Sequence, residues 1–120
     1  MSDAVLIVAH GSRRQQANDH LFQIVEETRK KMPGLIVEPA FLELAEPTIA
    51  VAVEKLAKQE VKHIKVLPFF LSKGIHWFED IPEDIDKKIE EDNLKMTYSL
   101  LEPIGCDPLI NQLIVDIIKR

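Results

Sequence analysis

The chain has 120 residues, 46% hydrophobic and 29% charged, which suits one compact domain over residues 1–120 and excludes a disordered or fibrous chain. The net charge of -5 argues against a general nucleic-acid surface. The single cysteine, Cys106, excludes an internal disulfide, and the apolar run at residues 4–9 is too short for a signal sequence or a membrane span. We therefore expect a cytoplasmic protein that binds neither nucleic acid nor membrane.

Strand-like and helix-like segments alternate along the chain. Residues 4–9 form a continuous apolar run, typical of a strand that is buried on both faces. The apolar stripe over residues 21–32 predicts a helix that ends at the following Pro-Gly pair. Residues 35–41 predict a second strand, and Pro39 places that strand at an edge of the sheet because proline cannot donate a ladder hydrogen bond.

The second half of the chain continues this alternation. Pro82 near the first turn of the third helix, and Asp107 followed by Pro108 before the last one, are typical helix starts. The predicted elements are a helix at 49–56, a strand at 63–68, a loop at 69–80, a helix after it, a strand at 95–101 and a helix carrying apolar residues from 109 to 118.

Four βα units predict an α/β fold with an open parallel sheet, right-handed crossovers and helices on both faces. In such sheets ligands bind beyond the carboxyl ends of the strands. Those ends are the loops at 10–14, 42–47, 69–78 and 102–106. The polar residues of interest fall in the first three of these loops, which indicates a single site.

Two histidines are the main candidates for chemistry. His10 directly follows the first strand and precedes Gly11, so it could serve as a base or a metal ligand, or belong to a helix-capping turn. His76 lies in the loop after the third strand, and it could instead be a surface residue. Because the first and third strands are neighbours in the usual doubly wound order, we expect both rings to converge. His20 and His63 are expected to be structural.

Charged side chains occur at the same edge. Glu43 and Glu46 could bind metal, accept a proton or hold a histidine, with Glu46 preferred, or they could cap a helix. Arg13, Arg14 and Lys73 suit a ligand with carboxylates, or they are ordinary solvated surface.

Aromatic side chains bracket the third loop. They could form the wall of a pocket for a flat macrocycle or belong to the core, as we expect for Phe69. These residues are Phe69, Phe70, Trp77 and Phe78.

Four motifs follow one another at the strand ends and together span essentially the whole chain: AHGSR, FLELAEPTI, PFFLSKGIHWFEDIP and EPIGCDPLINQLI. In this order they resemble the small sirohydrochlorin chelatases, the short class II chelatases of the CbiX type, which have nickel-inserting and iron-inserting relatives. The resemblance implies a flavodoxin-like fold, insertion of a divalent metal into a sirohydrochlorin-type tetrapyrrole, and a homodimer that replaces the two facing halves of longer relatives. The chain lacks the histidine-rich region of some relatives and the cysteine-rich tail of others.

The same resemblance implies roles for individual residues. His10 would bind metal and accept a proton, His76 would be the second metal ligand, and Glu46 would contact the substrate. The residues implied to contact the macrocycle are Leu71, Ser72, Lys73, Gly74 and Ile75. Ser12, Arg13 and Glu43 are possible supporting residues.

No prosthetic group is expected, because the metal is itself a substrate and the chain has neither a GxGxxG nor a Walker motif. Cobalt, and with it cobalamin synthesis, is the first choice on family grounds, with nickel or iron as alternatives. The sequence leaves two alternative functions open. A His-dependent phosphatase would need arginine before the histidine, where this chain has Ala9. A non-catalytic flavodoxin-like module that binds metal or tetrapyrrole is the second.

Overall fold

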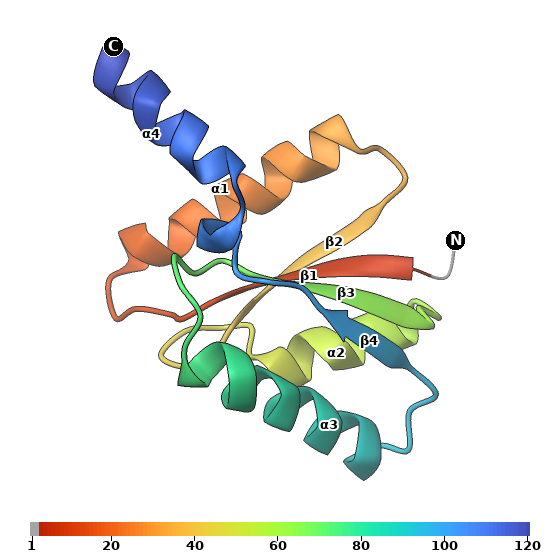
Figure 1. Cartoon of the computed structure of the whole chain (residues 1–120). Coiled ribbons are helices and arrows are strands. Elements are labelled where there is room, and N and C mark those ends of the chain that lie inside the picture. The colour runs from red at the N-terminus through yellow and green to blue at the C-terminus, as the bar shows by residue number, and fades with distance from the viewer. Residues whose placement is uncertain (1–2) are drawn as a thin grey trace.

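The computed structural model describes residues 3–120 and contains one sheet of four parallel strands in the order β2-β1-β3-β4 (Figure 1). This arrangement confirms the predicted α/β fold. The strands are β1 (Asp3–Ala9), β2 (Ile36–Phe41), β3 (His63–Pro68) and β4 (Thr97–Leu100). The helices are α1 (Gln15–Lys31), α2 (Ile49–Lys58), α3 (Ile81–Glu91) and α4 (Leu109–Lys119), with the short turns η1 (His76–Asp80) and η2 (Ile104–Cys106).

Strand order agrees with two expectations from the sequence. β2, which carries Pro39, is at an edge of the sheet. β1 lies between β2 and β3, so the first and third strands are neighbours as predicted. The fourth strand is shorter than residues 95–101, since only Thr97–Leu100 pair with β3.

Helices cover both faces of the sheet, and alternate residues of β1 supply the two cores. Leu6 and Val8 pack in the larger cluster with α2 and α3, and Ile7 packs in the smaller cluster with Leu21 and Val25 of α1. Figure 1 shows α2 and α3 on one side of the sheet and α1 on the other. No helix within residues 3–120 is long and apolar enough to cross a bilayer.

The last helix, α4, has the apolar stripe expected from the sequence, but nothing within residues 3–120 covers it. None of its residues is buried, and it projects away from the sheet on the side of α1 (Figure 1). Its exposed large apolar residues are Leu109, Leu113, Ile114, Val115, Ile117 and Ile118.

The part of the sheet formed by β3 and β4 is also open on the α1 side. His63 and Lys65 alternate along β3 with Ile64 and Val66, which are fully buried toward α2 and α3. His63 and Lys65 are not buried, and neither are Thr97 and Ser99, their register partners on β4. His63 bridges these two partners, with Nδ1 2.7 Å from the Thr97 hydroxyl and Nε2 2.9 Å from the Ser99 hydroxyl.

Tyr98, the only tyrosine of the chain, provides a test of the packing of β4 against α3. Its hydroxyl donates a hydrogen bond of 2.8 Å to Asp86 Oδ1. Burial, together with the hydrogen bond and charge of Asp86, raises the pKa of Tyr98 to about 12. Because the folded pKa is the higher one, this contribution to stability is fully present below pH ~10 and is lost as the pH rises through 12.

We expect an ultraviolet titration of tyrosinate in the folded protein to have its midpoint near pH 12. The urea-unfolded chain should titrate near the ordinary value of about 10. A folded-state midpoint equal to that of the unfolded chain would contradict this packing.

Candidate active site

The two histidines that the sequence predicted to converge do so at the carboxyl edge of the sheet. His10 follows β1, and His76 begins η1 after the loop that leaves β3. Their ring centroids are 4.7 Å apart and the ring planes are inclined by 44°. Each side chain retains 48% of its accessible surface. Two imidazoles are therefore available to a ligand at this edge.

Glu43, from the loop after β2, is the closest charged neighbour of His10. Its Oε1 lies 3.0 Å from His10 Nε2. The backbones of the two loops are joined as well, because Glu43 N–H donates to the His10 carbonyl over 3.0 Å. Gly11 permits this approach: its φ is +100°, and a Cβ there would lie 1.7 Å from the Glu43 carbonyl oxygen.

Asn18, which was not among the residues predicted from the sequence, holds the turn after His10. It is a buried residue of α1, and its Oδ1 accepts from Ser12 N–H over 3.0 Å while its Nδ2 donates to the Ser12 carbonyl over 2.8 Å. The Ser12 hydroxyl accepts from Arg14 N–H. Ser12 therefore supports the turn. The sequence did offer one indication that Asn18 is buried, because it lies on the same helical stripe as the apolar residues Leu21 and Val25.

His76 has its own carboxylate partner, Asp80, with Nδ1 2.6 Å from Oδ2. The segment predicted as a loop at 69–80 in fact ends at residue 75, since η1 is a π-helical turn that continues into α3. Ile81 N–H donates to the His76 carbonyl. Pro82 has no N–H for the carbonyl four residues earlier, which interrupts the regular helical ladder and favours this wider turn.

The predicted macrocycle-contacting segment, residues 71–75, is exposed throughout. Its side chains include two large apolar ones, Leu71 at 79% exposure and Ile75 at 63%. Lys73 lies in the same segment and pairs with Glu102, Nζ to Oε1, over 2.9 Å. The hydrogen bond and charge of Glu102 raise the pKa of Lys73.

Both ends of this segment are attached to the chain that follows β4. Gly105 N–H donates to the Phe70 carbonyl over 2.9 Å, and Trp77 Nε1 donates to the Leu101 carbonyl over 2.8 Å. A Cβ on Gly105 would lie 2.0 Å from the Leu71 carbonyl oxygen, so this contact also requires glycine. The segment is thus an exposed tip on a fixed base.

The aromatic residues around the third loop are mainly packed. Phe69 is half-buried in the smaller core cluster, as expected, and His20 meets it edge-on at 5.9 Å between ring centroids. Phe70 packs against the larger cluster. Phe78 is 70% exposed, so of the four aromatic residues it offers the most surface to a ligand.

Glu46 and Arg13 are exposed and have no hydrogen bond or ion pair within the part of the chain that the structure describes. No contact places either of them against the histidines. Helix capping does not explain Glu46, because α2 is capped by Thr48, whose hydroxyl accepts from Val51 N–H over 3.2 Å.

A small hollow of about 310 Å³ adjoins His76. Its lining includes the carboxylates of Glu43, Asp80, Glu83 and Asp84. Burial, then the charges of Glu83 and Asp80, raise the pKa of Asp84. Within residues 3–120, no group of three or more His, Cys, Asp or Glu side chains is arranged to hold a metal ion.

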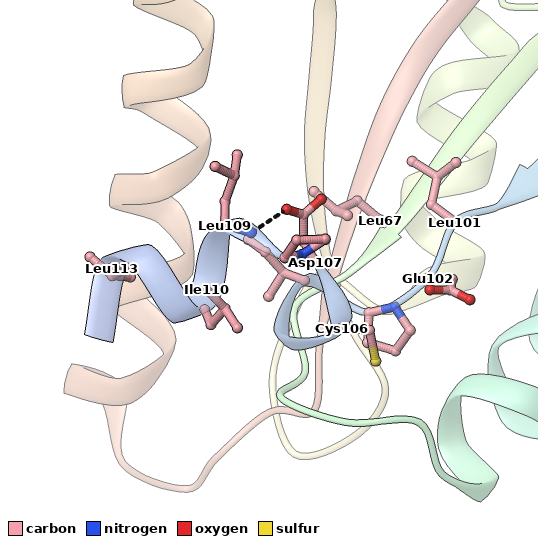
Figure 2. Close-up of a pocket in the computed structure, with 11 residues that line it drawn as sticks. Leu67, Leu101, Glu102, Cys106, Asp107, Leu109, Ile110 and Leu113 are labelled. Atoms are coloured by element: carbon pink, nitrogen blue, oxygen red, sulfur yellow. Dashed lines mark hydrogen bonds between the residues drawn. The ribbon is translucent and has the colours of Figure 1, made fainter. Parts of the chain in front are cut away.

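A larger apolar hollow of about 660 Å³ lies away from the histidines, between the ends of β3 and β4 and the start of α4. Figure 2 shows Leu67 and Asp107 between Leu109 of α4 and Leu101 after β4. Asp107 Oδ1 accepts from Leu109 N–H over 2.8 Å, which fits the predicted helix start. Neither His10 nor His76 lines this hollow, so it is separate from the candidate site although it is the larger of the two hollows.

Known proteins resemble this chain over its whole length. The CbiX family model matches residues 4–120. The sirohydrochlorin ferrochelatase of Arabidopsis thaliana chloroplasts is 36% identical over 99% of this chain and 52% of its own. The sirohydrochlorin cobaltochelatase of Methanopyrus kandleri is 32% identical over 98% of this chain and 95% of its own.

A solved structure is also similar to this chain in fold and in sequence. SirB from Bacillus subtilis with Fe³⁺ aligns with a TM-score of 0.88 at 33% identity, over 99% of this chain and 47% of that one. The chain therefore spans about half the length of SirB and of the Arabidopsis protein.

The close approach at Gly11 can be tested by substitution with alanine. In Gly11→Ala the new Cβ would meet the Glu43 carbonyl, so we expect a loss of about 1–3 kcal/mol in the free energy of unfolding. Gly34→Ala is a matched control, because Gly34 also has positive φ but open space around it. Urea denaturation of both variants measures the difference, and equal losses would contradict the close approach.

Proposed function

Because this chain belongs to the CbiX family, we propose that it is a chelatase that inserts a divalent metal ion into a sirohydrochlorin-type tetrapyrrole. The observation that carries the proposal is the pair of half-exposed imidazoles, His10 and His76, with ring centroids 4.7 Å apart. The pair lies at the sheet edge where ligands bind in open α/β folds. The metal is a substrate in this reaction, and the proposal needs no prosthetic group.

Metal insertion requires that the ion lose water while it stays close to the macrocycle. Imidazole is a good ligand for cobalt, nickel and iron, so His10 and His76 would replace water molecules on the ion. A site closed by four protein ligands would retain the metal. Two histidines at an exposed edge suit a site that passes the ion on.

Insertion also requires that two pyrrole N–H protons leave the macrocycle. We assign proton acceptance to His10, because a neutral imidazole is a suitable base near neutral pH. Glu43 Oε1, at 3.0 Å from His10 Nε2, would stabilise the imidazolium that forms. Glu43 is thus a supporting residue for the proton step.

The substrate would be held by the exposed tip of the third loop. Leu71 and Ile75 offer apolar surface to a flat ring. Lys73 would exchange Glu102 for a carboxylate of the substrate, and Arg13 is a second cation without an acidic partner among residues 3–120. Glu46 is proposed as a substrate contact, and Ser72 and Gly74 complete the tip.

Cobalt is the proposed metal. The match to this chain covers 95% of the cobaltochelatase of Methanopyrus kandleri, whereas it covers only 52% of the ferrochelatase of Arabidopsis thaliana. Nickel and iron are the alternatives, since the same ligands suit all three ions. The single, exposed thiol of Cys106 fits a reducing compartment, and we propose the cytoplasm.

The activity can be tested by anaerobic absorbance spectroscopy of sirohydrochlorin with the protein and Co²⁺, Ni²⁺ or Fe²⁺. We expect the wild-type protein to accelerate the spectral shift most with Co²⁺. His10→Ala should slow insertion by about 10²–10⁴-fold, the usual contribution of a general base. His76→Ala should raise the metal concentration needed for the half-maximal rate.

His20→Ala is the matched control, because His20 is an exposed histidine on α1 and should leave the rate unchanged. Wild-type turnover in His10→Ala would refute the proposed mechanism. Metal binding by the wild-type protein without any accelerated insertion would favour the non-catalytic binding module.

We further propose that two copies of the chain form the working site. A planar macrocycle has two faces, and one chain provides only one edge with histidines. The relatives that are twice as long contain a further segment of about this size, and a second copy would take its place. The fold of a single chain also leaves two surfaces uncovered.

The first such surface is the apolar stripe of α4, and the second is the open face of β3 and β4 on the α1 side. The apolar hollow at Leu67 and Leu101 connects the two surfaces. Each large apolar side chain that becomes buried contributes about 1.5–3 kcal/mol. We propose that α4 of each protomer covers the open sheet face of its partner.

Sedimentation equilibrium tests this assembly. The wild-type protein should have twice the mass of one chain, and the double variant Ile114→Glu, Ile118→Glu should have the mass of one chain because both residues are on the exposed stripe. Asn111→Glu, an exposed polar position of α4, should remain dimeric. A monomeric wild-type protein, or a dimeric double variant, would contradict the exchange of α4.

A further inference from the structure

We propose that Asp80 is a positioning residue that fixes the tautomer and the orientation of the His76 ring. The inference rests on the proposed function, in which His76 handles the metal. It starts from one short hydrogen bond, 2.6 Å between His76 Nδ1 and Asp80 Oδ2. Both side chains are partly exposed, at 48% and 40%, so the bond forms at the open edge of the site.

Asp80 does not have the structural role that its place in the sequence suggests. It directly precedes α3, where a carboxylate normally accepts from the first backbone N–H groups of a helix. The Asp80 side chain makes no such hydrogen bond. Among residues 3–120 its hydrogen bond to His76 is the only one, and no Lys or Arg pairs with it.

The chemistry of the pair determines which nitrogen of His76 is available. An ionised carboxylate only accepts hydrogen bonds, so Nδ1 of His76 must carry the hydrogen. In a neutral ring Nε2 then has the free lone pair, and it has no hydrogen-bond partner within the described residues. The pair thus presents Nε2 as the metal-binding atom, as outer carboxylates do for many metal-binding histidines.

The other histidine has the opposite arrangement. Glu43 lies against Nε2 of His10, whereas Asp80 lies against Nδ1 of His76. The carboxylate partner therefore contacts Nε2 in one ring and Nδ1 in the other, and the centroids of the two rings are 4.7 Å apart. This difference supports unequal tasks: both rings would bind the ion, His76 through Nε2 and His10 through Nδ1, and His10 Nδ1 would accept a pyrrole proton once the ion has passed to the macrocycle.

The backbone keeps Asp80 in place independently of this bond. His76 and Asp80 are the first and last residues of η1, and the next residue, Ile81, is fully buried in the larger core cluster. Ile85, one turn further along α3, is fully buried as well. Removal of the Asp80 carboxylate should therefore release the His76 ring and leave the fold intact.

The first test is the tautomer of His76 in the metal-free protein, measured from the nitrogen shifts and couplings of ¹⁵N-labelled histidine at a pH where the ring is neutral. We expect the Nδ1–H form for the wild-type protein. Asp80→Ala should show a mixture of tautomers or the Nε2–H form. An Nε2–H tautomer in the wild-type protein would overturn the inference.

The second test is the affinity for Co²⁺ alone, measured by calorimetry without tetrapyrrole. Asp80→Ala should bind Co²⁺ about 10–100-fold more weakly, the usual effect of losing such an outer carboxylate. Asp80→Asn keeps an oxygen acceptor for Nδ1–H and should lie closer to the wild type. Glu79→Ala is the matched control, because Glu79 is in the same turn and bonds neither histidine.

Equal losses in Asp80→Asn and Asp80→Ala would show that the charge matters rather than the orientation, and would overturn the inference. So would an unchanged affinity in Asp80→Ala. The thermal midpoints of all variants identify any general loss of folding. If the wild-type protein binds Co²⁺ and shows the expected tautomer but inserts no metal, the proposed function fails while the role of Asp80 stands.

Discussion

The site depends on the central position of β1 in a parallel sheet. β1 lies between β2 and β3, and backbone hydrogen bonds extend both pairings past the strand ends, from Leu42 to Ala9 and from Phe69 to Val8. The loops after these three strands are therefore held side by side at one edge. The loops after β1 and β2 are in close contact at Gly11, where only a glycine leaves room for the Glu43 carbonyl. The fold thus positions both histidines before any ligand is present.

Electrostatics at this edge come from carboxylates that contact the rings individually. Glu43 and Asp80 each lie at hydrogen-bonding distance from one imidazole, so each ring has one nitrogen engaged. Such a site provides few ligands for a metal ion and keeps one side of each ring available. Because the site is this open, the flat substrate that we propose would need a second wall. In our account that wall comes from a second copy, whose α4 would cover the open sheet face of the first.

Much of this could be predicted from the sequence, because strand order and strand ends follow from periodicity and from the position of Pro39. His10 and His76 followed from that order, and their convergence is confirmed. Asp80 was missed because a π-helical turn has no recognised period, so residues 76–80 were predicted to form a loop. The exposure of α4 was also beyond the sequence, since an apolar stripe shows that a helix face needs burial but not which chain covers it.

The central claim is that a metal ion binds between His10 and His76. Its most direct test is a crystal of the protein soaked with Co²⁺, with diffraction data collected at the cobalt absorption edge. We predict an anomalous peak within about 2.0–2.3 Å of a nitrogen of each ring, the distance typical of imidazole ligands. A peak elsewhere on the protein, with the space between the two rings empty, would contradict the account.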